Sequence, residues 1–191
     1  MTFEPEPDLA YRAAIEAEWA ADDDHFRHDP RSPLRPEDRE AFEGMPHFPI
    51  DESWRLRGLP LEPYAGDAPR EFGMAATLGE PRPSIRAGVF RFARGGAEHR
   101  LVAYQFIVDG ELDEHLFVPF MDATTGTETY GAGRYLDVVA EGDGAWTLDF
   151  NRAYHPSCAY NPRYSCPITP PENRLPIRVE AGVKLAEGHA H

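Results

Sequence analysis

Aromatic and β-branched residues alternate with polar ones along much of the chain after residue 83, as is typical of half-buried β-strands. Val102, Tyr104 and Phe106, for example, share one side of a strand because side chains in a strand alternate between two faces. We expect such faces to form the core. The pattern predicts strands over residues 84–94, 99–108, 115–121, 133–140, 145–151 and 176–185.

Turn-forming dipeptides separate several of these predicted strands. Gly95-Gly96, Asp109-Gly110 and Asp143-Gly144 each fall between neighbouring strand segments, where a tight hairpin turn is needed. The chain is therefore predicted to be mainly β, with an antiparallel meander. A sheet of this size closes its edges most simply as a barrel, which we favour, or as a folded-over sandwich.

Helical patterns are confined to the N-terminal part of the chain. Asp8 is a suitable N-cap for an amphipathic helix that reaches about His28. Pro36 then predicts the start of a second, short helix that runs to Phe42 and stops at Gly44. We therefore expect one or two N-terminal helices, forming a cap over residues 8–44.

Size and charge narrow the functional classes. A chain of 191 residues with 41% hydrophobic residues predicts a single domain over residues 1–186, followed by a flexible tail at 187–191. The net charge of -14 argues against nucleic acid and anionic membrane surfaces as partners. Residues 1–8 lack the basic and apolar regions of a secretion signal, so a cytoplasmic location is expected. The oligomeric state stays open.

The stretch from Met121 to Pro176 contains the least ordinary sequence. A polar loop with three glycines runs from Met121 to Tyr135, and the segment from Ser157 to Pro176 is rich in proline and polar residues. Proline presets the backbone while polar side chains offer charge and hydrogen bonds. We expect this stiff segment to fold back over one end of the sheet and gather distant polar side chains into one site.

Two carboxylates and several arginines in this stretch suggest chemistry. Asp149 or Glu172 is a candidate general base, and Arg134 or Arg152 is a candidate for binding an anionic group through two parallel hydrogen bonds. The same residue types also form ion pairs that pin loops, and that alternative stays open. The candidate ligand-binding residues are Glu128, Tyr130, Arg134, Asn151, Arg152, Tyr154, Tyr160 and Asn173.

His155, Cys158 and Cys166 are the weak candidates for a metal site. One histidine and two cysteines, together with water, can hold a catalytic zinc ion. Their spacing matches no known zinc signature, so no cofactor is favoured and zinc is a minor alternative. The other readings are a buried histidine beside two buried thiols, or a disulfide between Cys158 and Cys166.

Seven short motifs are spread over nearly the whole chain. They are Ser32–Leu34, Phe42–Pro49, Thr129–Leu136, Leu148–Tyr154, Cys158–Asn161, Cys166-Pro167 and Pro170–Leu175. Together they resemble one protein family, the bacterial and archaeal domain of unknown function 1684. That family has no assigned activity, so the resemblance implies no substrate. The chain departs from it at His155, where the family more often has asparagine.

Three functions remain open from the sequence. The first is a β-barrel that binds a small polar or anionic compound at its end. The second is a hydrolase or isomerase that uses a carboxylate base and an arginine. The third is a structural or assembly protein in which the same residues only lock the fold.

Overall fold

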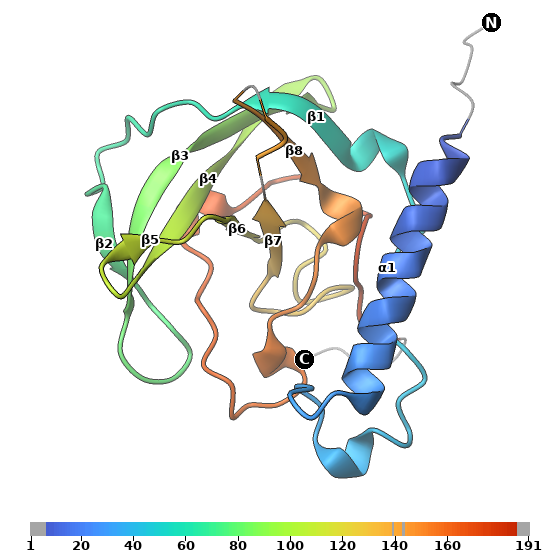
Figure 1. Cartoon of the computed structure of the whole chain (residues 1–191). Coiled ribbons are helices and arrows are strands. Elements are labelled where there is room, and N and C mark those ends of the chain that lie inside the picture. The colour runs from blue at the N-terminus through green and yellow to red at the C-terminus, as the bar shows by residue number, and fades with distance from the viewer. Residues whose placement is uncertain (1–6, 139, 143, 187–191) are drawn as a thin grey trace, which may run out of the picture.

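The computed structural model describes residues 7–186 except 139 and 143. The expected tail at 187–191, and Asp143 of the third predicted turn, lie outside the described residues. A single curled antiparallel sheet dominates the fold and forms a half-barrel (Figure 1). Its strands run in the order β2-β3-β4-β6-β7, and β5 pairs with β4. They are β2 (Glu71–Met74), β3 (Arg82–Arg94), β4 (Ala97–Val108), β5 (Glu111–Leu112), β6 (Leu116–Phe120) and β7 (Arg134–Val138).

A separate two-stranded ribbon joins the two edges of the curled sheet. It consists of β1 (Arg55–Pro60) and β8 (Ala145–Asp149), which pair antiparallel. Isolated bridges link the ribbon to the half-barrel, between Glu62 and Val89 on one side and between Ala140 and Trp146 on the other. The expected barrel is therefore present as a half-barrel with a ribbon attached at both edges.

The hairpins predicted from turn dipeptides are confirmed at two places. Gly95 and Gly96 have φ values of 60° and 77°, and they join the long strands β3 and β4. Asp109 and Gly110 have φ values of 53° and 86° between β4 and β5. Positive φ at both central residues is the geometry whose twist matches that of the flanking strands, so the local sequence fixes these two turns.

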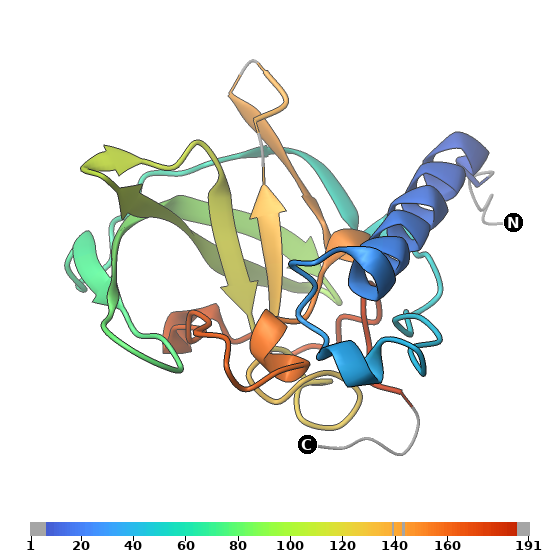
Figure 2. The ribbon, with the colours of Figure 1, turned by 60° about the horizontal axis from the view of Figure 1, so that its bottom comes forward.

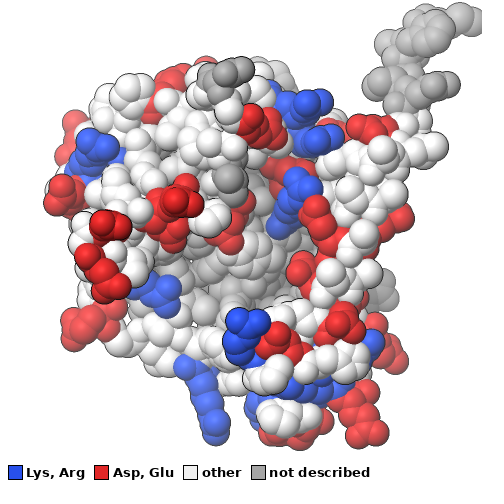
Figure 3. Space-filling view, in the orientation of Figure 1, with Lys and Arg blue, Asp and Glu red and all other residues white. Residues whose placement is uncertain are grey.

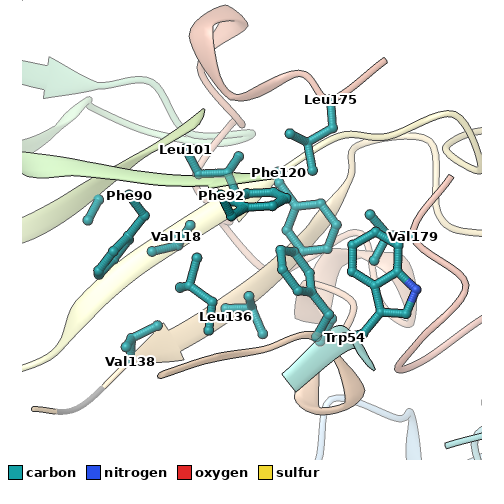
Figure 4. Packing of buried hydrophobic residues seen from close by; sticks show 14 of the residues in the cluster. Trp54, Phe90, Phe92, Leu101, Val118, Phe120, Leu136, Val138, Leu175 and Val179 are labelled. Atoms are coloured by element: carbon teal, nitrogen blue, oxygen red, sulfur yellow. The ribbon is translucent and has the colours of Figure 1, made fainter. Parts of the chain in front are cut away.

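The main core lies on one face of the half-barrel. Alternate residues such as Leu101, Val118 and Leu136 lie there in one cluster with Trp54 and Val179 (Figure 4). Residues at the positions in between, among them Val102, Phe117 and Tyr135, form a smaller cluster on the opposite face. This division follows from the period of two in a strand, because both faces of the sheet are covered.

The N-terminal helix α1 (Leu9–His28) is confirmed, and the Asp8 carboxylate accepts a hydrogen bond from the Tyr11 amide as an N-cap. The second expected helix, over 36–42, is wrong: only Pro36–Asp38 form a 3-10 turn. A short helix nucleates poorly, and the Phe42 carbonyl instead accepts a hydrogen bond from the Arg27 guanidinium at 2.7 Å. Further 3-10 turns span Glu52–Trp54, Phe150–Arg152, Ser157–Ala159 and Pro171–Asn173.

The strand predicted over residues 176–185 is also wrong. This segment is extended and its valines are buried, but it pairs only through an isolated bridge between Val183 and His47. The carbonyls of Val179 and Ala181 accept hydrogen bonds from the guanidinium of Arg134, which takes the place of a neighbouring strand as donor. Figure 2 shows this C-terminal part lying beneath the sheet rather than within it.

Candidate functional site

A pocket of about 360 Å³ lies between the C-terminal half of α1 and the segment that follows β8. Figure 3 shows the molecule hollowed on the face that carries both β7 and α1, with acidic and basic side chains around the hollow. The pocket is therefore assembled from parts of the chain that are far apart in sequence. It is lined by Asp22, His25, Phe26, Arg31, Pro33, Met45, Arg152, Tyr154, His155, Ser157 and Tyr160.

A row of hydrogen bonds holds α1 against the turn after β8. The Tyr11 hydroxyl lies 2.8 and 2.9 Å from the two carboxylate oxygens of Asp149. Two turns further along the same helix face, the Trp19 indole N–H donates to the Asn151 carbonyl at 3.2 Å. Residues four and eight positions apart share a helix face, so these contacts fix the helical wall of the pocket.

Arg152 is the main basic group at the pocket. Its guanidinium forms two 2.7 Å hydrogen bonds with Glu18, through Nε and Nη2, and reaches Asp149 through Nη1 at 3.2 Å. The side chain remains 45% exposed. A half-exposed ion pair of this kind contributes little to stability, so the guanidinium is open to exchange of its partner for a ligand anion.

His155 offers a neutral hydrogen-bond donor at the buried side of the pocket. The Tyr130 amide donates to its Nε2 at 3.1 Å, which places the ring proton on Nδ1. Burial, with the nearby charge of Arg134 adding to it, lowers the pKa of His155 to about 3. The ring is thus uncharged at neutral pH.

Aromatic rings supply much of the apolar surface of the pocket. The ring of Tyr160 packs edge-on against Phe26 of α1, with 4.8 Å between centroids. Its hydroxyl lies 3.3 Å from the sulfur of Met45, and burial raises its pKa. A planar compound has a matching surface here, beside the polar groups contributed by Arg152 and His155.

The comparison with known families gives a clear result. Residues 40–184 match the model of the family described as "Protein of unknown function (DUF1684)". The chain belongs to this family. No curated protein matches the chain.

The DUF1684 chain is also similar to a solved structure, the solution NMR structure of an uncharacterized protein from gene locus rrnAC0354 of Haloarcula marismortui. The sequences are 28% identical, and the TM-score is 0.69. The likeness covers 94% of this chain and 97% of that chain, so both proteins share the whole fold. The family membership expected from the motifs is confirmed by the match to the family model.

The sequence-predicted site residues of this DUF1684 chain fall into separate groups. Arg152, Tyr154, His155 and Tyr160 meet at the pocket. Asp149 and Asn151 lie just behind its wall, where they bind α1. The other candidates do not reach it. The expectation that Glu128, Arg134, Asp149, Arg152 and Glu172 converge on a single pocket is therefore corrected: of these five, only Arg152 lines the pocket described above.

Arg134 is fully buried and binds the protein's own backbone. Its guanidinium donates to the carbonyls of Val179 and Ala181 at 2.8 and 2.5 Å, and it lies 3.4 Å from Asp122. Burial lowers the pKa of Arg134 to about 10, so it is charged at neutral pH. Because this guanidinium has no exposed surface, it holds the C-terminal segment in place rather than binding a ligand.

Asn173 and Glu172 stand together beside the sheet, away from Asp149. The Asn173 amide is fully buried and bonds to Val102 and Pro119. The Glu172 carboxylate accepts hydrogen bonds from Arg86 at 2.8 Å and from the Tyr104 hydroxyl at 3.0 Å. The pKa of Glu172 is lowered because these two donors outweigh the effect of its burial.

Glu128 and Tyr130 also lie outside the pocket. The Glu128 carboxylate pairs with Arg178 at 2.6 Å on the surface. The Tyr130 hydroxyl lies 4.0 Å from the sulfur of Cys158, and its backbone amide supports His155. Tyr130 therefore helps to position a pocket residue without lining the pocket itself.

The zinc alternative gains no support from the geometry. Within the described part of the chain, no three His, Cys, Asp or Glu side chains come together as a metal site requires. Cys158 and Cys166 are both free thiols, and the Cys158 amide lies 3.2 Å from the sulfur of Cys166. Burial is the largest cause that raises the pKa of Cys158, to about 11.

Sequence reasoning missed the helical wall of the pocket. Asp22, His25 and Phe26 line it from α1, and Met45 lines it from the loop that follows. A signal was present in the sequence, since Asp22 and Phe26 continue the helix face that Ile15 and Trp19 begin.

None of the described helices is long and apolar enough to cross a membrane.

Proposed function

We propose that this domain binds a small anionic compound with a planar, apolar part in the pocket between α1 and the segment Arg152–Tyr160. The observation that carries the proposal is the arrangement of donors over an aromatic surface. Arg152 and Arg31 supply positive charge, His155 supplies a neutral N–H, and Tyr160 packs against Phe26 beside them. A pocket of about 360 Å³ matches the usual size of a small-molecule site.

Two arginines and one carboxylate, Asp22, line the pocket, so its charge favours an anion despite the acidic surface of the protein. The ion pair of Arg152 with Glu18 is half exposed, so a ligand carboxylate or phosphate can take the place of the Glu18 carboxylate at small cost. The His155 ring is neutral, so it donates without charge and without a pH switch near neutrality. The ligand would therefore be bound by one ionic contact and one neutral hydrogen bond.

An enzymatic role with a carboxylate base has less support. Asp149 is 4% exposed and already accepts hydrogen bonds from Tyr11, Asn151 and Arg152. Glu172 is engaged by Arg86 and Tyr104. A general base needs a free lone pair aimed at the substrate proton. Both oxygens of Asp149 are engaged by the fold, and Glu172, whose Oε1 accepts from Arg86 and Tyr104, lies outside the pocket. We therefore favour binding over catalysis.

The proposal is tested by titrating isotopically labelled protein with benzoate and phenylphosphate, with benzyl alcohol as the uncharged probe. We expect the backbone amide signals of residues 152–160 to shift, and the anions to bind more tightly than the alcohol. Arg152→Gln should weaken anion binding about tenfold, as the loss of one charge-assisted contact predicts, and leave the alcohol unaffected. Arg100→Gln, an exposed arginine on β4, is the matched control.

Two results would contradict the proposal. The first is equal affinity of Arg152→Gln and Arg100→Gln for the anions, since it would show that the guanidinium at the pocket makes no ionic contact. The second is a failure of all three probes to shift the signals of residues 152–160, which would leave the pocket without a small-molecule role. Circular dichroism of both variants checks that they remain folded.

A further inference from the structure

A second pocket, of about 320 Å³, opens on the face of the sheet opposite the main core. Phe106, Phe117 and Tyr135 reach it from β4, β6 and β7, because they alternate with the core residues of those strands. The segment from Pro156 to Pro167 covers its other side. The pocket lies wholly within the part of the chain that the family model matches, whereas α1 lies outside that part.

Aromatic rings form the walls of this second pocket. The rings of Phe117 and Tyr135 lie 4.7 Å apart at 75°, and those of Tyr135 and Tyr154 lie 5.8 Å apart at 89°. Phe106 packs on Phe117 at 5.2 Å, and Tyr164 also lines the pocket. Phe117 and Tyr135 are almost fully covered by their neighbours, whereas Tyr154 and Tyr164 keep 38% and 36% of their surface exposed and present π-surface at the pocket.

The tyrosine hydroxyls at the pocket already have acceptors for their protons. The Tyr135 hydroxyl donates to the Pro167 carbonyl, and the Tyr154 hydroxyl donates to Asp137 at 2.5 Å. The pocket thus offers aromatic and apolar surface, and its charged acceptor is the Asp137 carboxylate. A primary ammonium needs several acceptors, whereas a fully methylated ammonium needs none.

One acidic and one basic side chain also line the aromatic pocket. Asp137 supplies a carboxylate beside Tyr154. Arg82 is exposed, its guanidinium carbon lies 5.9 Å from the centre of the Phe106 ring, and it donates to the Ser165 carbonyl. Aromatic faces and a carboxylate attract a cation, while an exposed guanidinium attracts a carboxylate.

We infer that this aromatic pocket binds a small quaternary ammonium compound that carries a carboxylate, with the ammonium held by the rings and Asp137 and the carboxylate by Arg82. The site is separate from the anion pocket proposed above, although Tyr154 and Ser157 line both. The chemistry differs as well, since the anion pocket relies on Arg152 and a planar apolar group.

Three probes separate the contributions. Trimethylglycine carries both the quaternary ammonium and the carboxylate. Choline keeps the cation and lacks the carboxylate, and 3,3-dimethylbutanoate has the shape of trimethylglycine with carbon in place of the charged nitrogen. In titrations followed by the amide signals of Phe117, Asp137 and Tyr164, trimethylglycine should bind about tenfold more tightly than 3,3-dimethylbutanoate, because the isostere lacks the cation–π attraction.

Single substitutions identify which side chains bind the ammonium and which bind the carboxylate. Tyr164→Leu keeps an apolar side chain on an exposed position, and it should weaken both trimethylglycine and choline about fivefold through loss of one π-face. Arg82→Gln should weaken trimethylglycine and leave choline unchanged. Arg152→Gln, which alters only the anion pocket, should change neither, so failure of one proposal is distinguishable from failure of the other.

The inference is overturned if 3,3-dimethylbutanoate binds as tightly as trimethylglycine, since the pocket would then be merely apolar. It is equally overturned if none of the three probes shifts the signals of the aromatic pocket. Unchanged trimethylglycine affinity in both Tyr164→Leu and Arg82→Gln would place the binding elsewhere.

Discussion

The buried side chain of Asn173 takes over hydrogen bonds that the sheet itself cannot make. Between β4 and β6 the strands pair only at Tyr104 and Phe117. Further along, β6 presents Pro119, which has no amide proton to donate. The Asn173 side chain accepts from the Val102 amide and donates to the carbonyls of Val102 and Pro119, each at 2.8 Å. It therefore acts as a substitute for the missing strand partner.

We predict that Asn173→Ala is severely destabilising. The substitution leaves the Val102 amide, the Val102 carbonyl and the Pro119 carbonyl without partners in a site with no solvent exposure. An unsatisfied buried backbone group costs about 1–3 kcal/mol, so the loss of partners for three such groups should lower the free energy of unfolding by roughly 3–9 kcal/mol. That is a large part of the stability of about 5–15 kcal/mol typical of a domain.

Equilibrium urea unfolding measures this loss of free energy. The matched control is Asn161→Ala, on a more exposed turn, for which we expect a change below about 1 kcal/mol. If Asn173→Ala does not fold, hydrogen exchange of the unaltered protein gives the same information, because the Val102 amide should exchange only through global unfolding. A loss below about 1 kcal/mol for Asn173→Ala, or rapid exchange of the Val102 amide, would refute this account of the sheet.

Three further predictions follow from buried polar groups. Arg134→Met should lower the free energy of unfolding in urea by roughly 3–5 kcal/mol, because it leaves the buried Asp122 without its ionic partner. An unchanged unfolding midpoint would show that the Arg134 guanidinium is not needed to hold the C-terminal segment. The pKa of His155 is lowered to about 3, so the unfolded state binds the proton more tightly than the folded state. The free energy of unfolding should therefore fall as the pH drops from about 6.5 towards 3. His155→Gln should flatten that part of the pH profile, and a profile identical to that of the unaltered protein would contradict the prediction. Tyr11→Phe, which removes the hydroxyl bound to Asp149, should lower the melting temperature by several degrees through a loss of about 1–3 kcal/mol, and an unchanged melting temperature would show that this contact does not anchor α1.

Local chemistry in the sequence predicts the hairpins well. Gly95-Gly96 and Asp109-Gly110 require only their own backbone preferences, and the long strands on either side carry the period-two pattern that a sheet buried on both faces still retains. The register of β3 and β4 follows from the length of the turn as far as Gly88, and a bulge between Arg86 and Gly88 then shifts it by one residue. These elements are predictable because the residues that determine them are neighbours in the chain.

The same reasoning fails for residues 176–185 because an extended backbone can satisfy its carbonyls in two ways. The alternating buried residues Val179, Ala181 and Val183 suit a strand, and their burial is as expected. The donor that binds their carbonyls is a side chain from β7, Arg134, rather than the amides of an adjacent strand. The period-two pattern indicates which face of the segment is buried, but not which group satisfies its backbone carbonyls.

The candidate site was only partly predictable for a related reason. The polar residues between Met121 and Pro176 are numerous because this part of the chain has few strand partners, and buried backbone groups must be satisfied by other means. Arg134 and Asn173 serve that need, whereas Arg152 and Tyr154 are left with exposed surface at the pockets. Residue type alone cannot separate these two uses. The distinction depends on whether a buried carbonyl or amide lies within reach, and that is decided by contacts between distant segments.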